Sequence, residues 1–139
     1  MNFDPKHFMT LATELDAEAR QMKGLDEAGL REAKFRSAIS RAYYAVFWRG
    51  RHYFARTTPS QPLPGFSAHY ELRRTFDSYR GKSMRRIAKN MGELFAARRQ
   101  ADYEMNVANL ESKSADMLTL ANRLLNDIGN LPDDPTEAP

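Results

Sequence analysis

Hydrophobic residues along most of this chain recur at steps of three and four positions, which is the period of an amphipathic helix. The first such stripe comprises Phe8, Leu11, Leu15, Ala19 and Met22. Asp4 and Pro5 precede it in the order typical of a helix start, since aspartate accepts hydrogen bonds from free N–H groups and proline fits the first helical position. Gly24 is typical of a helix end. We therefore predict a helix over residues 5–23.

A longer helix is predicted over residues 26–56, followed by one clear loop. Its apolar stripe comprises Phe35, Ile39, Ala42, Tyr43, Val46, Phe47, Gly50, Tyr53 and Phe54. Three prolines within six residues exclude a helix interior from the loop at 57–65. Ser67 is a suitable N-cap for a third helix that ends near residue 79, with Leu72 and Phe76 facing the core.

Two more helices are predicted, the fourth from about residue 83 and the fifth from about residue 106. Their apolar positions are Met84, Ile87, Met91, Leu94, Phe95, Leu110, Met117, Leu120, Ala121, Leu124 and Ile128. Strand-like alternation is absent from the sequence, and short connections favour antiparallel neighbours. The predicted fold class is all-α, a four- to five-helix up-down bundle over residues 1–130. The acidic, proline-rich residues 131–139 lack apolar periodicity, which predicts a disordered tail.

Charge is distributed very unevenly along the chain. Residues 33–70 hold six basic and no acidic side chains, and residues 71–100 hold nine basic and three acidic ones. This basic block, residues 33–100, therefore has a net charge of +12 in a chain whose total is +3. Such a block attracts polyanions with an affinity that falls with salt. The alternative is that the acidic ends of the chain neutralise it within the bundle.

Composition excludes several kinds of chemistry. There is no cysteine, so disulfides and thiolate sites are excluded, and the three histidines do not form a zinc-binding pair. Neither a phosphate-cradling glycine loop nor a hydrolase nucleophile elbow is present, so we expect no metal and no cofactor. No apolar run reaches the length of a membrane span and the N-terminus lacks a signal-peptide pattern, so we expect a cytoplasmic protein without a membrane partner.

An aromatic pair in the second helix is the first candidate for function. Adjacent residues of a helix point about 100° apart, so Tyr43 fits the core stripe while Tyr44 lies beside it with Trp48, near Arg41 and Arg51. One interpretation is that Tyr44 and Trp48 pack in the core with satisfied polar groups. The other is that they form a partner interface, such as that of a homodimer.

Arg98 is the second candidate, because the apolar stripe of the fourth helix continues from Leu94 to this arginine. Asp102 lies one turn further on the same face, where it is placed to form an ion pair. Either this pair closes the bundle, or Arg98 meets a phosphate in a polar cleft.

His69, at the start of the third helix, is either a local hydrogen-bonding residue or a catalyst. The predicted nucleic-acid-binding residues are Arg73, Arg74, Arg85, Arg86 and Arg99.

Taken together, three segments resemble the HEPN domain family in its small stand-alone members. They are Ser40-Arg41-Ala42-Tyr43-Tyr44-Ala45-Val46-Phe47, then His69 with Leu72 and Phe76, then Arg98-Arg99-Gln100-Ala101-Asp102-Tyr103. The resemblance covers residues 8–128 and implies a four- to five-helix bundle that forms homodimers. Many members are ribonucleases, including toxins paired with a nucleotidyltransferase antitoxin and modules of phage defence. In active members an arginine is followed, after four to six residues, by a histidine at the dimer cleft.

Arg98 matches the family arginine, but Tyr103, Glu104 and Met105 occupy the positions where the histidine would stand. The resemblance therefore implies two alternatives. One is a metal-independent endoribonuclease, in which Arg98 binds the scissile phosphate and His69, Asp102 or Tyr103 assists. An ordinary tyrosine, with a pKa of about 10, is a poor base at neutral pH. The other is a non-catalytic dimer that binds RNA, a nucleotide or a protein partner such as a nucleotidyltransferase antitoxin.

Overall fold

The computed structural model describes residues 3–59 and 68–139. Within these two ranges the chain forms five α-helices and two short 3₁₀ turns, with no strand. The helices are α1 (Lys6–Gln21), α2 (Ala28–Thr57), α3 (Ala68–Asp77), α4 (Lys82–Tyr103) and α5 (Leu110–Gly129), and the 3₁₀ turns are η1 (Leu25–Glu27) and η2 (Pro135–Glu137). The predicted all-α class is confirmed. The predicted cap Ser67 and most of the proline-rich loop lie outside the described residues.

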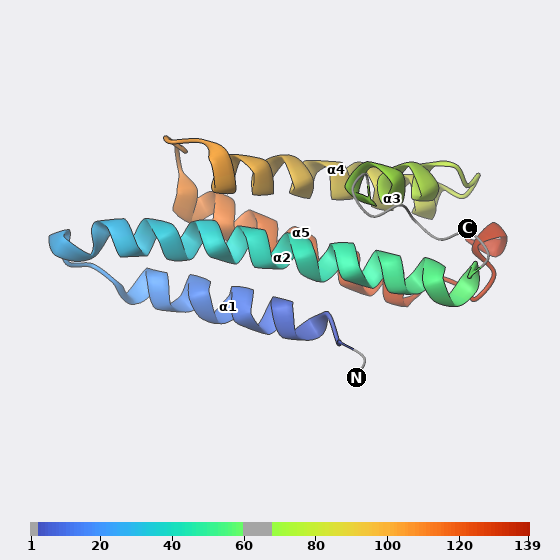
Figure 1. Ribbon diagram of the computed structural model, residues 1–139, viewed down its shortest axis with the longest axis horizontal. Helices are drawn as coiled ribbons and strands as arrows, with labels where there is room; N and C mark the ends of the chain where they lie inside the picture. Colours follow the sequence, from blue (N-terminus) through green and yellow to red (C-terminus); the bar gives the residue numbers. More distant parts are fainter. Residues whose placement is uncertain (1–2, 60–67) are drawn as a thin grey trace.

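The four long helices form an up-down bundle with α2 at its centre (Figure 1). Successive long helices run in opposite directions, α1 and α4 lie on opposite sides of α2, and α5 lies behind it. The short helix α3 packs on α4 and touches α2 towards one end of the bundle. One face of α2 therefore lies between α1 and α4, and neither of these helices covers it.

The core follows the predicted apolar stripes of α2, α3, α4 and α5. Its largest fully buried side chains are Tyr43, Phe35, Phe76, Ile39, Leu72, Met84, Ile87, Met91, Leu94, Leu124 and Val46. Gly50 lets α3 approach α2 closely, because a Cβ at this position would lie 3.1 Å from side-chain carbons of both Leu72 and Phe76. Close packing of this kind fixes where α3 and its first residues sit.

In α1 the predicted stripe is only partly correct. Met9, Ala12 and Ala19 are buried, whereas Leu11 is 41% exposed and Leu15 is half-buried. The reason is that α1 packs against α2 and α5 from one side only, and in its first half this side runs through Met9 and Ala12, one position after the predicted Phe8 and Leu11. An apolar edge of α1 is thereby left beside the uncovered face of α2.

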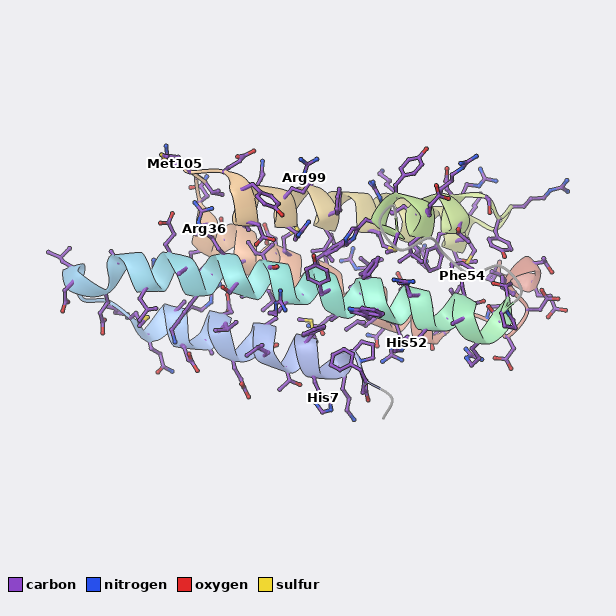
Figure 2. The ribbon with its side chains drawn as sticks, in the orientation of Figure 1. His7, Arg36, His52, Phe54, Arg99 and Met105 are labelled. Atoms are coloured by element: carbon purple, nitrogen blue, oxygen red, sulfur yellow. The ribbon has the colours of Figure 1, made fainter. Side chains whose placement is uncertain are left out.

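The C-terminal turn of α4 is held by a side chain from α2. This turn contains no basic residue and is followed by Glu104 rather than glycine, so α4 has no local cap for its last carbonyl groups. Arg36 donates hydrogen bonds to the carbonyl oxygens of Ala101 (2.9 Å), Glu104 (2.7 Å) and Met105 (2.9 Å). Figure 2 shows Arg36 and Met105 at this end of the bundle. The last turn of α4, which directly follows the turn that carries Arg98, is thus tied to α2.

The chain between α4 and α5 differs from the prediction. Helix α5 begins at Leu110 rather than near residue 106, because Asn109 adopts a left-handed conformation (φ 55°) immediately before it. Asparagine adopts the left-handed conformation at a lower cost than most residues do, so the chain can turn at Asn109 and begin α5 directly after it.

The acidic tail also differs from the disorder that its composition predicts. The Tyr53 hydroxyl donates to the carbonyl of Pro132 (2.6 Å), Pro135 is buried, and the backbone N–H of Ser83 donates to Pro139 (2.9 Å). Arg56 forms an ion pair with Asp133 at 2.7 Å. Composition misses this arrangement because the partners come from α2 and α4, far away in sequence.

Candidate nucleic-acid interface

Arg98 lies in the penultimate turn of α4 with a side chain that is only 13% exposed. Its Nε is 2.9 Å from Oδ2 of Asp102, so the predicted ion pair is confirmed. The Nε–H is nevertheless outside hydrogen-bonding geometry towards this oxygen and has no other acceptor among the described residues. Attraction between the two charges, rather than an aligned hydrogen bond, therefore holds them together.

Tyr44 provides the second contact of Arg98. Arg98 Nη2 donates a hydrogen bond to the Tyr44 hydroxyl (3.0 Å), and the guanidinium carbon lies 5.3 Å from the centre of the Tyr44 ring. On another side it lies 5.6 Å from the ring of Tyr103. Nη1 donates to no group in the described part of the chain. Both N–H groups of Nη1 are thus left for an anionic oxygen, in a guanidinium whose position is already fixed.

The surroundings of Arg98 form a groove of about 490 Å³ on the uncovered face of α2. Its lining residues are Leu11 and Leu15 from α1, Ser37, Ser40, Arg41 and Tyr44 from α2, and Arg98 and Asp102 from α4. Buried Ser40 donates a hydrogen bond of 3.3 Å to Oδ2 of Asp102. One wall of the groove is therefore apolar and the opposite wall carries the ion pair.

His69 lies beside Tyr44 but does not line the groove. Its Nδ1 is hydrogen-bonded to the Tyr43 hydroxyl at 2.6 Å, and its ring lies 4.4 Å from the ring of Phe47 and 5.9 Å from that of Tyr44. Burial, and then the positive charges of Arg98, Arg73 and Arg51, lower the pKa of His69 below its ordinary value of 6.5.

At neutral pH His69 is therefore uncharged. Its Nδ1 is engaged, and Nε2 is the ring nitrogen left for another group. Burial raises the pKa of Tyr43, so its hydroxyl keeps its proton throughout the physiological range.

Tyr103, Glu104 and Met105 stand where the resemblance to HEPN proteins would place a histidine. Tyr103 is 72% exposed, with its ring close to Arg98, and Met105 is 88% exposed in the turn after α4. The carbonyl oxygens of Glu104 and Met105 are bound by Arg36, which fixes their backbone. Tyr103 is the only one of the three whose side chain is placed beside Arg98.

The predicted aromatic face is present, although it is not freely exposed. The guanidinium carbon of Arg41 lies 5.2 Å from the centre of the Tyr44 ring, and that of Arg51 lies 5.3 Å from the centre of the Trp48 ring. Tyr44 and Trp48 are each half-buried and pack against the core. The core interpretation therefore holds in part, since each ring is partly in the core and partly covered by an arginine, and the partner interface stays a prediction.

The predicted nucleic-acid-binding arginines fall into two groups. Arg73, Arg74 and Arg85 line one hollow between α3 and α4. Arg86 and Arg99 are exposed outside this hollow, and Figure 2 shows Arg99 projecting from the outer side of α4. The structure therefore gathers three of the five residues.

Most positive charges of the basic block have no carboxylate partner. Within the described ranges only Lys34, Arg36, Arg56 and Arg98, of its fifteen basic residues, lie within ion-pair distance of an acidic side chain. Glu18, Glu32, Asp102 and Asp133 are the acidic side chains of the chain ends that form these four pairs. Asp4, Asp16 and Glu111 pair outside the block, and the other acidic side chains of the described ends form no ion pair. The alternative in which the ends neutralise the block is therefore wrong for most of its residues.

Sequence reasoning missed three links of the site, which are the bond from Arg98 to Tyr44, the pairing of Tyr43 with His69, and the clasp of Arg36 on α4. Only the third leaves a signal in the sequence, because a helix end without glycine or a basic last turn requires an external donor.

In the described residues, no three histidine or acidic side chains gather as a metal ion would require. None of the described helices combines the length and apolar character needed to cross a membrane. Comparison with family models, with curated proteins and with solved structures finds no significant match to this chain.

Proposed function

We propose that this protein is a HEPN-like, RNA-associated protein that receives an RNA phosphate at Arg98. The observation that carries the proposal is the largely buried guanidinium with a free Nη1, held between Asp102 and Tyr44 at one edge of a largely uncompensated basic surface. A positive surface with interleaved aromatic rings is the arrangement that binds single-stranded nucleic acid. The resemblance to HEPN proteins supports a cytoplasmic role in a toxin–antitoxin or defence module.

The same residues support a cleavage reaction without a metal ion. Cleavage needs a base that removes the proton of a 2′-hydroxyl and a cation that stabilises the phosphorane formed when this oxygen attacks the phosphorus. The bond from phosphorus to the 5′-oxygen then breaks, which leaves a 2′,3′-cyclic phosphate, and the 5′-oxygen takes a proton from the protonated base or from water. Arg98 suits the second role. Neutral His69 suits the first better than Tyr103 does in the tautomer whose Nδ1–H donates to the Tyr43 hydroxyl, because Nε2 then carries the lone pair that accepts the proton. Asp102 is the counter-ion that orients Arg98. We keep binding as the primary proposal and cleavage as its stronger form.

The test is a titration of a short single-stranded RNA at two salt concentrations with wild-type protein, Arg98→Ala and the matched control Arg123→Ala. We expect wild-type binding to weaken with salt and Arg98→Ala to lower the slope of log affinity against log salt by about 0.7, the loss of one phosphate contact. Arg123, which is exposed on α5, should not affect the slope. Equal behaviour of the three proteins would contradict the proposal, and cleavage lost in Arg98→Ala would establish its stronger form.

A second candidate function follows from the apolar wall of the groove. Leu11 is 41% exposed and Leu15 half-buried beside Arg98, which suits a protein partner better than RNA. That partner would be a second copy of the chain or an antitoxin of the nucleotidyltransferase kind. Light scattering on wild-type protein and on Leu11→Glu tests the homodimer. A dimeric mass that becomes monomeric in the variant supports it, and a monomeric wild type contradicts it.

A further inference from the structure

A hollow of about 320 Å³ lies between α3 and α4, separate from the Arg98 groove. Its lining residues are Tyr70, Arg73, Arg74, Asp77, Arg85, Ala88 and Lys89. Four of these side chains are cationic and one is acidic. In the described ranges none of the four cations lies within ion-pair distance of Asp77 or of any other carboxylate.

Arg73 is the most constrained of these cations. Its guanidinium carbon lies 4.8 Å from the centre of the Phe95 ring, and a Cβ at Gly92 would lie 3.2 Å from Nη1. Its Nε is buried and has no acceptor among the residues described. Packing therefore holds a charged side chain in a site where the protein supplies neither a counter-ion nor an acceptor for Nε. Such an arrangement costs stability unless an external anion completes it.

The positions of the other cations in the hollow are also electrostatically unfavourable. Arg85 and Lys89 are four residues apart on one face of α4, where like charges repel. Arg85 is oriented by the hydrogen bond from its Nη2 to the carbonyl of Arg80 (2.9 Å). Tyr70 is 58% exposed at the rim, so its ring is available to a flat partner. A phosphate attached to a base satisfies all these groups, because it carries negative charge and a surface that stacks on tyrosine.

We propose that the hollow between α3 and α4 binds the phosphate of a nucleotide, with the base on Tyr70. The phosphate comes either from a free mononucleotide or from an RNA strand. The first form is independent of the Arg98 groove, and the second rests on the proposed function. Arg73 also lies close enough to His69 for its charge to lower the pKa of that side chain.

The test compares wild-type protein with the double variant Arg74→Gln/Lys89→Gln, in which both altered side chains are exposed. The matched control is Lys23→Gln/Arg123→Gln, which removes the same charge from exposed positions outside the hollow. Adenosine 5′-monophosphate, adenosine and a short single-stranded RNA are titrated into each protein at low salt, and Arg98→Ala is titrated in parallel. Circular dichroism checks that all variants fold.

A free-nucleotide site predicts that adenosine monophosphate binds about tenfold more weakly to the hollow variant than to the control, while adenosine does not bind. A site for the RNA backbone predicts the same loss for the RNA alone. The proposal is overturned if the hollow variant binds both phosphate probes as well as the control does. If Arg98→Ala weakens RNA binding in that case, the proposed function stands and only the hollow is excluded.

Discussion

At the scale of single residues, Arg98 carries a buried charge that needs partners, and it keeps one hydrogen-bond donor group, Nη1, that these partners do not use. A guanidinium that is largely buried needs compensation, and Asp102 and the Tyr44 hydroxyl provide it at 2.9 Å and 3.0 Å. Neither contact uses Nη1. The side chain of Arg98 is therefore held in place while some of its hydrogen-bond donors stay unused. An arginine with a purely structural role in the bundle would have all of its donors paired.

Tyr44→Phe tests the positioning of Arg98. The variant keeps the ring and removes the acceptor of Arg98 Nη2, so we expect the free energy of unfolding to fall by about 1 kcal/mol and the RNA affinity to fall with it. Urea denaturation and RNA titration measure the two effects. Tyr79→Phe is the control, because the Tyr79 hydroxyl has no hydrogen bond to the rest of the described chain. Equal affinities for the two variants would show that Tyr44 does not position Arg98.

His69 predicts a pH dependence of stability. Its pKa is lowered in the folded protein, first by burial and then by Arg98, Arg73 and Arg51, so below pH 6.5 the unfolded chain binds more protons at this position than the folded one. Stability from this group is therefore complete above pH 6.5 and is lost as the pH falls through the folded pKa.

The corresponding measurement is urea denaturation of wild-type protein and His69→Gln at about pH 7.5 and about pH 5. We expect the wild type to lose more stability than the variant between the two pH values. A variant that loses as much as the wild type would exclude His69 as the source.

At the scale of elements, hydrophobic periodicity is sufficient to predict the helices, because each element buries one face. Phe35, Ile39 and Leu94 are fully buried on the stripes predicted for α2 and α4. In α1, by contrast, the exposed Leu11 shows that periodicity alone does not define which side a neighbouring helix covers. The first residue of α5 differs from the prediction for a different reason, because the left-handed conformation of the single residue Asn109 determines where this helix begins.

Arg36 is expected to stabilise the last turn of α4. Arg36→Met removes the donors to four carbonyl groups, so we expect the free energy of unfolding to fall by about 2 kcal/mol and amide exchange in residues 98–103 to accelerate. Arg36→Lys keeps the charge but not the planar fork, so it should recover only part of the loss. Arg123→Met on α5 is the control, and exchange rates equal to those of the control would rule out the clasp.

At the scale of the whole molecule, the site is assembled from α1, α2, α3 and α4. The spacing of residues in the sequence predicts only those contacts of the site that lie within one helix. The pair of Arg98 and Asp102 was predictable because four residues make one turn. The contacts of Arg98 with Tyr44 and of Tyr43 with His69 join residues more than twenty positions apart, and no local pattern encodes them. The basic block was visible in the sequence, but only the bundle shows that most of it has no acidic partner.

The central claim, that an RNA phosphate meets the Arg98 guanidinium, is tested most directly by nuclear magnetic resonance of the arginine side chains. The Nε–H signal of Arg98, assigned by its loss in Arg98→Lys, is followed while a short single-stranded RNA is added. We predict that this signal shifts progressively and saturates with the same affinity as the binding curve. An Arg98 signal that stays in place while RNA binds elsewhere on the molecule would contradict the account.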